Sequence, residues 1–347
     1  IFYAFSILSL LGLFVFGKTI NGATSWYNFG FIGLQPSEFV KVFTALAVAK
    51  LLSDHRQYNF NLIKNQVKAF IIIFLPAFLI ILQPDAGSAL IYLAFFFVLN
   101  REGLSLNYIL LGLSTLLIFI STIYFDPETI ITSLFILITF FVILIIKKAG
   151  KRYLRFNWYK IVGVYLLLGI FVFSTNYFYK HVLDSYEKDR FDILLGIKTD
   201  NKGVGYNSYQ SELTISSGGL NGKGFLNGDL TQGDFVPEQH TDYIFSTVGE
   251  EWGFIGASLV IIAFMLMMYR IIYLAETHSN KFGRVYGYGL ASILFFHVIV
   301  NIGMVIGLLP TVGIPLPFFS YGGSSLWGFT ILLFIFLRLD AHKNYDW

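Results

Sequence analysis

The chain has 347 residues, of which 56% are hydrophobic and 13% are charged. A soluble globular chain carries about 25% charged residues, so this composition excludes a cytosolic enzyme and a disordered regulator. The chain also lacks the concentrated basic face of a nucleic-acid-binding protein, because its 24 Lys and Arg nearly balance its 21 Asp and Glu. Cysteine is absent, which excludes disulfides and thiol chemistry. These figures predict an all-α, polytopic transmembrane helical bundle.

Apolar runs separated by polar or Pro/Gly-containing segments predict about ten spans. In chain order they cover residues 1–17, 38–52, 67–82, 86–99, 107–124, 129–146, 159–179, 243–268, 284–309 and 317–337. Several are shorter than the ~20 residues that cross a bilayer, so we expect their ends to extend into flanking polar residues. No Met or charged stretch precedes the first run, which therefore does not resemble a signal peptide; we expect a fragment that begins inside a longer protein.

Basic residues orient the predicted bundle. They concentrate in every second connection, namely in loops 53–66, 100–106, 147–158 and 269–283 and in the C-terminal tail. The intervening short loops contain a single base, Lys18. Because basic loops stay in the cytoplasm, we predict that the chain start and the C-terminus are both cytoplasmic.

Residues 181–242 differ from the short loops. They contain ten acidic and five basic residues and are rich in Gly, Asn and Ser, and we expect a long, structureless extracytoplasmic loop. Loops of this length without regular structure are usually functional. We expect residues 1–347 to form a single membrane domain around it.

Polar or Pro-rich clusters lie at four span ends, all on the predicted extracytoplasmic side. They are 35–38 (QPSE), 83–85 (QPD), 237–242 (PEQHTD) and 315–325 (PLPFFSYGGSS). Their concentration at one end of the bundle predicts one site that opens outward. Each cluster also has a simpler interpretation, because Asp85 and Asp242 could cap helices and Glu38 could complement a helix dipole.

Two pairs of ionisable residues lie inside the predicted spans. Glu38 and Lys41 are three residues apart on one helical face, and charges at this depth are usually functional, with a structural ion pair as the alternative. Glu250 and Glu251 follow Asp242 by about two helical turns. The helical angle favours Glu250 for the cavity of Asp242, and we expect Glu251 to pair with a neighbouring helix.

The remaining polar residues indicate less. His297 and Asn301 are an i,i+4 pair, for which we favour interhelical hydrogen bonding. His240 stands alone, without the ligand spacing of a transition-metal site. Gly222-Lys223-Gly224 is too short to be a phosphate-binding P-loop motif.

Taken together, these motifs resemble the SEDS family (shape, elongation, division and sporulation proteins). The matching stretches are Gly22-Ala23 with Trp26, QPSEFVK (35–41), QPDAGS (83–88), Tyr206, Ser216-Ser217-Gly218-Gly219-Leu220 running into Gly222-Lys223-Gly224, PEQHTDYIF (237–245), Glu250-Glu251 and VNIGMVIGLLPTVGIPLPFFSYGGSS (300–325). They follow the family order over nearly the whole chain. The residues that make up these motifs resemble the members that act in cell elongation and rod shape (RodA-type) more than those that act in division (FtsW-type).

The resemblance implies a peptidoglycan glycosyltransferase that polymerises lipid II at the outer face of the bacterial cytoplasmic membrane, with a class B penicillin-binding protein, a transpeptidase, as its partner. The family's essential aspartate corresponds to Asp242, the expected general base of an inverting transfer. The substrate-binding residues that we expect are Glu38, Lys41, Asp85, Arg190, Lys223, Glu238, Thr241, Glu250, Asn301, Ser320 and Ser324. The leaving pyrophosphate needs positive charge, for which Lys41, Arg190 and Lys223 are candidates, and assistance by Mg²⁺ or Mn²⁺ is left open.

Three features depart from the family pattern. Ser25 and Gln239 stand where the family commonly has Arg, so the phosphate contacts expected of those arginines are in doubt. The family usually has one span between the QPD helix and the long loop, whereas this chain has three predicted spans there. We also expect two further spans upstream of Ile1.

A flippase or transporter for a polyprenyl-linked substrate is the main alternative, because broken helices and intramembrane charges also suit transport. A transporter needs polar access from both sides, and the cytoplasmic span ends lack Pro/Gly-rich polar clusters. A scaffold without catalytic activity is a third interpretation, which would leave the polar cluster without a purpose.

Overall fold

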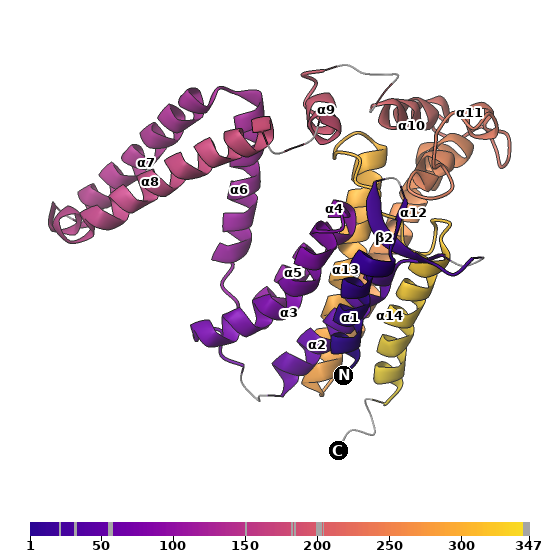
Figure 1. The fold of residues 1–347 in the computed structure, drawn as a ribbon, viewed down its shortest axis with the longest axis horizontal. Helices are drawn as coiled ribbons and strands as arrows, with labels where there is room; N and C mark the ends of the chain where they lie inside the picture. The colour runs from indigo at the N-terminus through magenta and orange to yellow at the C-terminus, as the bar shows by residue number, and fades with distance from the viewer. Residues whose placement is uncertain are drawn as a thin grey trace. The chain divides into compact units, whose positions relative to one another are not determined.

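A computed structural model describes residues 1–20, 22–30, 33–54, 58–149, 151–181, 183, 185–198, 203 and 205–342. Its elements, in chain order, are α1 Phe2–Phe16, β1 Lys18–Ile20, β2 Ala23–Asn28, β3 Gly33–Leu34, α2 Pro36–Ser53, α3 Ile63–Ile81, α4 Ala86–Leu90, the 3₁₀-helix η1 Ile91–Ala94, α5 Phe95–Arg101, α6 Asn107–Tyr124, α7 Pro127–Ala149, α8 Lys151–His181, α9 Ser185–Leu194, α10 Tyr206–Ser217, α11 Asp229–Gln232, α12 Ile244–Glu276, α13 Lys281–Val305 and α14 Gly323–His342 (Figure 1). The chain divides into a main unit, Ile1–Ser105 with Tyr206–Trp347, and a second unit, Leu106–Gly205.

Each of the ten predicted spans corresponds to helix. Among the described residues, 7 helices are long and apolar enough to cross a membrane: α3, α6, α7, α8, α12, α13 and α14. The other three predicted spans correspond to α1, to the shorter apolar stretch Ala86–Arg101, and to α2, which contains the charged residues Glu38, Lys41 and Lys50. The prediction of an all-α polytopic bundle is therefore confirmed.

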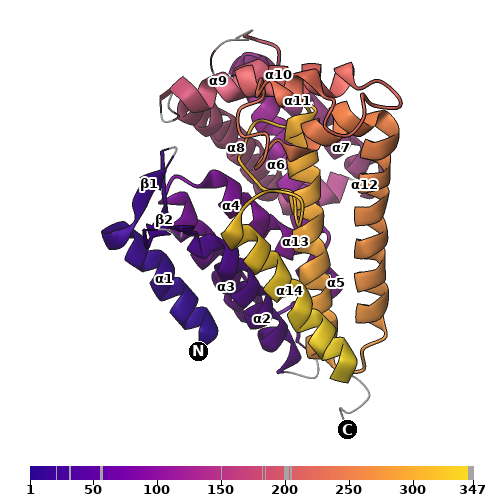
Figure 2. The same ribbon diagram turned by 90° about the vertical axis from the view of Figure 1, so that its right-hand side faces the viewer.

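Helix α13 is the centre of the main unit. It packs against α2, α5, η1, α12 and α14, and most of its residues are buried. Figure 2 shows α13 with α12 on one side and with α2 and α14 on the other. Small residues permit this close packing: a Cβ at Gly287 would lie 2.5 Å from the Phe336 ring and 2.7 Å from Ala275 Cβ.

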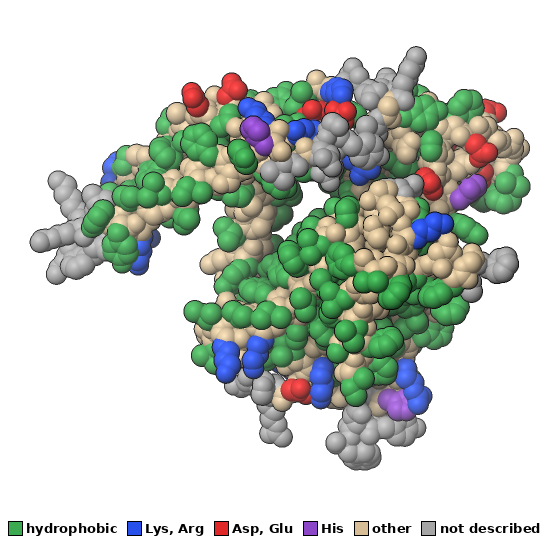
Figure 3. Space-filling view, viewed as in Figure 1, with side chains coloured by type: hydrophobic (Ala, Val, Ile, Leu, Met, Phe, Trp, Pro, Cys, Tyr) green, Lys and Arg blue, Asp and Glu red, His purple; other side chains and the backbone are tan. Residues whose placement is uncertain are grey.

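Ion pairs join helix ends at the end of the main unit that we predict to be cytoplasmic. Arg101 at the end of α5 bonds Glu276 at the end of α12, with 2.7 Å between Nη2 and Oε1. Glu102 pairs with Lys281 and with Arg284 at the start of α13. Figure 3 shows basic side chains gathered where α2 and α14 end. The alternation of span directions predicted from the loops thus places these ends together.

A small antiparallel sheet, in the order β1-β2-β3, was not predicted. It packs beside α1, where the Tyr27 hydroxyl donates to the Ser9 carbonyl at 2.8 Å. The backbone of Thr24 donates to the Gln83 carbonyl at 3.1 Å, which joins the sheet to the QPD segment. The sheet therefore orders residues that the sequence suggested were a simple loop.

The prediction of a structureless loop over residues 181–242 is wrong. The segment contains α9, α10 and α11, and α10 packs against α12 and α13 in the main unit. The Ser211 hydroxyl donates to the Val305 carbonyl at 2.7 Å, which fixes α10 to the end of α13. Polar composition concealed this order because the partners lie on distant helices.

The segment after α10 also completes an interruption in α12. Gly253 has φ 62° and ψ −162°, a conformation that is essentially restricted to glycine and that breaks the helical hydrogen bonding. The carbonyls of Glu250 and Glu251 accept from the backbone amides of Lys223 and Gly224, each at 3.0 Å. The amides beyond the break, of Phe254 and Ile255, donate to the carbonyls of Gly219 and Leu220 at 2.9 and 3.2 Å. Four hydrogen bonds therefore join the segment Gly219–Gly224 to the break.

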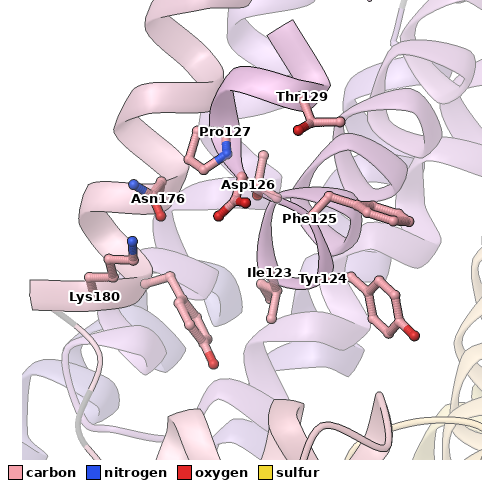
Figure 4. Close-up of a pocket in the computed structure, with 10 residues that line it drawn as sticks. Ile123, Tyr124, Phe125, Asp126, Pro127, Thr129, Asn176 and Lys180 are labelled. Carbon is pink, nitrogen blue, oxygen red and sulfur yellow. The ribbon is translucent and has the colours of Figure 1, made fainter. Parts of the chain in front are cut away.

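The second unit holds the three predicted spans between the QPD helix and the long loop. Its helices α7 and α8 lie side by side as a hairpin, and α6 packs against α8 (Figure 1). The Thr139 and Tyr165 hydroxyls lie 2.7 Å apart between α7 and α8. Near the turn from α6 to α7 a cavity of about 290 Å³ is lined by Thr122, Ile123, Tyr124, Phe125, Asp126, Pro127, Thr129, Asn176, Tyr179 and Lys180 (Figure 4).

We predict that Gly253→Ala destabilises the protein. The new Cβ would lie 2.3 Å from the Gly222 amide nitrogen, and the positive φ would strain any other residue by ~1–3 kcal/mol. The thermal midpoint of the purified protein in detergent should fall, and the segment around Gly222 should become sensitive to protease. Gly112→Ala in α6 is the control, since its Cβ would meet nothing within 4 Å. Equal midpoints for both variants would contradict this view of the break.

Candidate active site

The structure brings the four predicted polar clusters together at one end of the main unit. Gln35, before α2, donates from Nε2 to Asp85 Oδ2 at 3.1 Å, and its backbone amide donates to Ser324 Oγ at 3.1 Å. Ser320 Oγ donates to the Thr241 carbonyl at 2.6 Å. The QPSE, QPD, PEQHTD and PLPFFSYGGSS segments are thus joined directly by hydrogen bonds.

Asp242 lies in the turn before α12. The helix cap is Tyr243, and no side chain makes a capping hydrogen bond there, so the alternative that Asp242 only caps the helix is wrong. Gly313, with φ +69°, leaves room for the carboxylate, because a Cβ there would lie 3.3 Å from Asp242 Oδ2. Burial, followed by the charges of Glu238 and Asp85, raises the pKa of Asp242 to about 6. A carboxylate with this pKa is suited to accept a proton near neutral pH.

Glu38 and Lys41 form the predicted pair inside α2. Lys41 Nζ lies 2.6 Å from Glu38 Oε2, and both side chains are about 95% buried. The ammonium is also 3.0 Å from His297 Nε2 and 4.2 Å from the centre of the Phe329 ring. Lys41 is therefore enclosed by α2, α13 and α14, and its contact with the pyrophosphate stays a prediction.

Asp85 caps α4, as its simpler interpretation proposed. Its Oδ1 accepts from the Ser88 amide at 3.0 Å and its Oδ2 from the Ser88 hydroxyl at 2.9 Å. The carboxylate is half-buried, also contacts Gln35, and affects the titration of Asp242 through its charge. Capping and a place in the site are therefore compatible for Asp85.

Four further predicted residues position the turns around Asp242. Asn301 Nδ2 donates to the carbonyls of Asp242 and Ile314, each at 2.7 Å. Thr241 Oγ1 donates to Glu238 Oε2 at 2.9 Å. The Ser320 hydroxyl accepts from the Leu316 amide at 2.7 Å, and Ser324 Oγ donates to the Gly33 carbonyl at 3.2 Å. These contacts place Glu238 and Thr241 beside Asp242 and leave their substrate contacts as predictions.

Glu250 and Lys223 form a separate cluster. The Glu250 side chain is fully buried and accepts from Lys223 Nζ, Ser217 Oγ, Thr231 Oγ1 and the amides of Leu230 and Thr231, at 2.5 to 3.2 Å. Hydrogen bonds to Glu250 and Asp229 raise the pKa of Lys223. With its oxygens occupied in this way, Glu250 holds the segment after α10 in place, and the described contacts do not place it beside Asp242 as we had expected.

Gln239 and Ser25, which replace the family's arginines, are both buried. Gln239 Nε2 donates to Asp234 Oδ1 at 2.6 Å and to the Thr231 carbonyl at 3.1 Å, so it stabilises the turn before Asp242. Arg190 lies on α9 in the second unit, and its contact with the pyrophosphate stays a prediction.

No group of three or more potential metal-ligating side chains (His, Cys, Asp or Glu) occurs within the part of the chain that the structure describes. The negative charges of Asp85 and Glu238 repel the carboxylate of Asp242, and a bound cation would reduce this repulsion. Mg²⁺ is commonly held by one or two carboxylates together with substrate phosphates. Asp85 fits that pattern in combination with a phosphorylated ligand.

The sequence did not predict the contact of His297 with Lys41. The predicted interhelical hydrogen bond is confirmed for His297, which bonds Lys41 on α2 as well as the Pro315 carbonyl. Asn301 instead donates to the carbonyls of Asp242 and Ile314, which lie outside the helices. A polar i,i+4 pair in an apolar helix was the available signal. Its spacing indicated the face of the helix but could not identify Lys41, 256 residues away, as a partner.

Fold and site together define a polytopic membrane protein with a carboxylate-centred site at one end of its bundle. The sequence profile of the FtsW, RodA and SpoVE proteins, described as cell cycle proteins, matches residues 1–133 and 115–345. The chain belongs to this family.

Individual relatives agree with this assignment. The chain is 34% identical to the peptidoglycan glycosyltransferase MrdB of Escherichia coli (strain K12) over 343 residues, covering 99% of the chain and 77% of that relative. It is 31% identical to the peptidoglycan glycosyltransferase RodA of Treponema pallidum (strain Nichols), covering 98% and 82%. A solved structure of a peptidoglycan synthase complex that coordinates polymerisation and crosslinking has a chain with TM-score 0.68 and 26% identity, covering 99% and 81%.

Proposed function

We propose that this protein is a peptidoglycan glycosyltransferase that polymerises lipid II into glycan strands for cell elongation. Its relatives MrdB and RodA are named as peptidoglycan glycosyltransferases, which supports the enzyme class. The observation that carries the chemistry is the Asp242 carboxylate, half-buried beside Gly313 and raised in pKa to about 6. Similarity to RodA-type relatives supports the elongation role.

In the proposed reaction a sugar hydroxyl of one substrate attacks the anomeric carbon of another. Asp242 takes the proton of the attacking hydroxyl as the new glycosidic bond forms. The bond to the pyrophosphate breaks on the opposite face of the sugar, which inverts an α-linked donor into a β-linked product. Pyrophosphate leaves readily, so the protein has no need of a strong acid at that oxygen.

The leaving pyrophosphate develops negative charge, and three features of the site can offset it. The N-terminus of α14 begins at Gly323 beside Gln35, and helix N-termini favour anions. The buried Lys41 adds positive charge below the site. Mg²⁺ or Mn²⁺, held by Asp85 together with the pyrophosphate, would supply a Lewis acid and leave the Asp242 carboxylate free to accept the proton; we keep this cation as part of the proposal.

The flippase alternative requires a path through the opposite end of the bundle. There Arg101–Glu276 and Glu102 with Lys281 and Arg284 join α5, α12 and α13. These ion pairs hold the ends of α5, α12 and α13 together on that side. Polar segments gather at one end of the bundle, and ion pairs join the helix ends at the other. This arrangement favours an enzyme that acts on one side of the membrane.

We also propose the orientation and partner of the protein. The loops joined by the ion pairs would face the cytoplasm, and Asp242 would face outward, as the basic loops predict. A class B penicillin-binding protein would assemble with the chain, which the similarity to a chain of a peptidoglycan synthase complex supports.

We predict that Asp242→Asn abolishes polymerisation while preserving the fold. Asn retains the shape of the side chain but removes its charge and basicity, and loss of a general base costs about 10²–10⁴-fold in rate. The assay is polymerisation of labelled lipid II by the purified protein, with and without a class B penicillin-binding protein and with and without EDTA. Asp54→Asn, at an exposed ion pair with Lys50, is the matched control.

Near-normal polymerisation by Asp242→Asn would remove Asp242 from the catalytic role. Full activity in EDTA would remove the cation from the proposal. If the chain neither copurifies with the transpeptidase nor responds to it, the proposed partner is wrong.

The pKa of Asp242 predicts the pH dependence of the reaction. A base must be unprotonated, so the rate should rise with pH through about 6 and level off above it. Well below that value the rate should fall about tenfold per pH unit. A rate that is constant between pH 5 and 8 would show that Asp242 does not titrate in the working range.

Cysteine labelling can test the orientation, because the chain contains no cysteine. Asn61 and Asn221 are both exposed, Asn61 before α3 and Asn221 in the segment joined to the Gly253 break. An impermeant maleimide applied to spheroplasts should label Asn221→Cys and spare Asn61→Cys. The reverse pattern would invert the predicted topology.

A further inference from the structure

His297 lies within α13, is about 99% buried, and contacts two segments that surround the candidate site. Its Nε2 lies 3.0 Å from Lys41 Nζ on α2. Its Nδ1 lies 3.1 Å from the carbonyl oxygen of Pro315, which precedes α14. One imidazole thus connects the buried cation to the segment before α14.

The chemistry of these partners determines the tautomer of His297. A carbonyl oxygen only accepts, so Nδ1 carries the proton and donates to Pro315. A lysine ammonium only donates, so Nε2 is unprotonated and accepts from Lys41. Both ring nitrogens are therefore used, and the neutral ring is held in one orientation.

Lys41 is held from three directions. Glu38 Oε2 accepts at 2.6 Å, His297 Nε2 accepts at 3.0 Å, and the Phe329 ring lies with its centre 4.2 Å away. Phe329 also contacts His297 edge-on, with ring centres 4.7 Å apart. Without the His297 acceptor, one direction of the ammonium would lose its partner in an apolar environment.

The Pro315 segment forms part of the surroundings of Asp242. Gly313 approaches the Asp242 carboxylate, and Ile314 shares Asn301 with the Asp242 backbone. Beyond Pro315, Ser320 bonds the carbonyl of Thr241. A displacement of Pro315 would therefore be transmitted to Asp242 from both sides.

We propose that His297 is a positioning residue for the glycosyl transfer. It fixes the Lys41 ammonium through Nε2 and the Gly313–Ser320 segment through Nδ1, and so sets the distance between the buried cation and Asp242. This inference rests on the proposed function. It extends that proposal to a residue that touches no reacting atom.

Two substitutions separate the two bonds. In His297→Gln the side-chain oxygen can reach the place of Nε2 and accept from Lys41, but the bond to Pro315 is lost. In His297→Asn the amide nitrogen can replace Nδ1 and donate to Pro315, but the acceptor for Lys41 is lost. Tyr286→Phe is the control, because Tyr286 is equally buried on α13 and loses one hydrogen bond, to the Leu332 carbonyl.

We expect both His297 variants to lower kcat for lipid II polymerisation by about 10- to 100-fold with little change in KM, because misplacement of about 1 Å costs up to that much. Tyr286→Phe, at a similar thermal midpoint, should lose less than about twofold. The double variant Lys41→Met with His297→Asn should have nearly the same kcat as Lys41→Met alone, because both substitutions act through the Lys41 ammonium. The proposal would be overturned if the losses in kcat of His297→Asn and Lys41→Met added up in the double variant. It would also be overturned if the His297 variants lost no more activity than Tyr286→Phe.

A second measurement does not depend on enzymatic activity. A nitroxide attached at Tyr321→Cys, an exposed position after Ser320, reports the mobility of the segment before α14. The label should become more mobile with His297→Gln and remain as in the unsubstituted protein with His297→Asn. Unchanged mobility in both variants would overturn the role at Pro315 even if lipid II proved not to be the substrate. Inactivity of the unsubstituted protein with the expected mobility pattern would count against the proposed function alone.

Discussion

The buried ammonium of Lys41 is the constraint around which the main unit is organised. A charge inside an apolar bundle destabilises the fold unless polar or charged partners surround it. Removing one partner of a buried ion pair typically costs ~3–5 kcal/mol of stability. Glu38 is supplied by α2, His297 by α13 and Phe329 by α14. Gly328 allows α14 to approach, because a Cβ there would lie 2.9 Å from the Glu38 carbonyl. Three helices must therefore meet around one cation, and the turns that carry the site follow from where those helices end.

The sequence predicted those parts of the structure that depend on local spacing or on direction. Glu38 and Lys41 are three residues apart in one helix, so helix formation alone brings them together. The apolar runs alternate in direction, and alternation gathers the polar ends of non-adjacent spans, such as those at Gln35 and Ser324, on one side. Asp85 precedes a helix and caps it, which is also a local property.

Features that depend on a distant partner could not be predicted. The helical angle favoured Glu250 for the cavity of Asp242, whereas its hydrogen-bond partners are Lys223 and Thr231, which no periodicity relates to α12. The role of His297 similarly depends on its contact with Lys41, which is distant in the sequence. The strands β1 and β3 are too short, at 3 and 2 residues, to show alternation.

The break at Gly253 has a consequence for the order in which the protein is assembled. The segment Gly219–Gly224 is synthesised before α12, so the backbone groups of α12 that it bonds are not yet present when it leaves the ribosome. The carbonyls of Glu250 and Glu251, just before the break, would in turn be unsatisfied if α12 entered lipid alone. Insertion of α12 and ordering of the preceding segment should therefore be coupled, because each supplies hydrogen-bond partners that the other lacks.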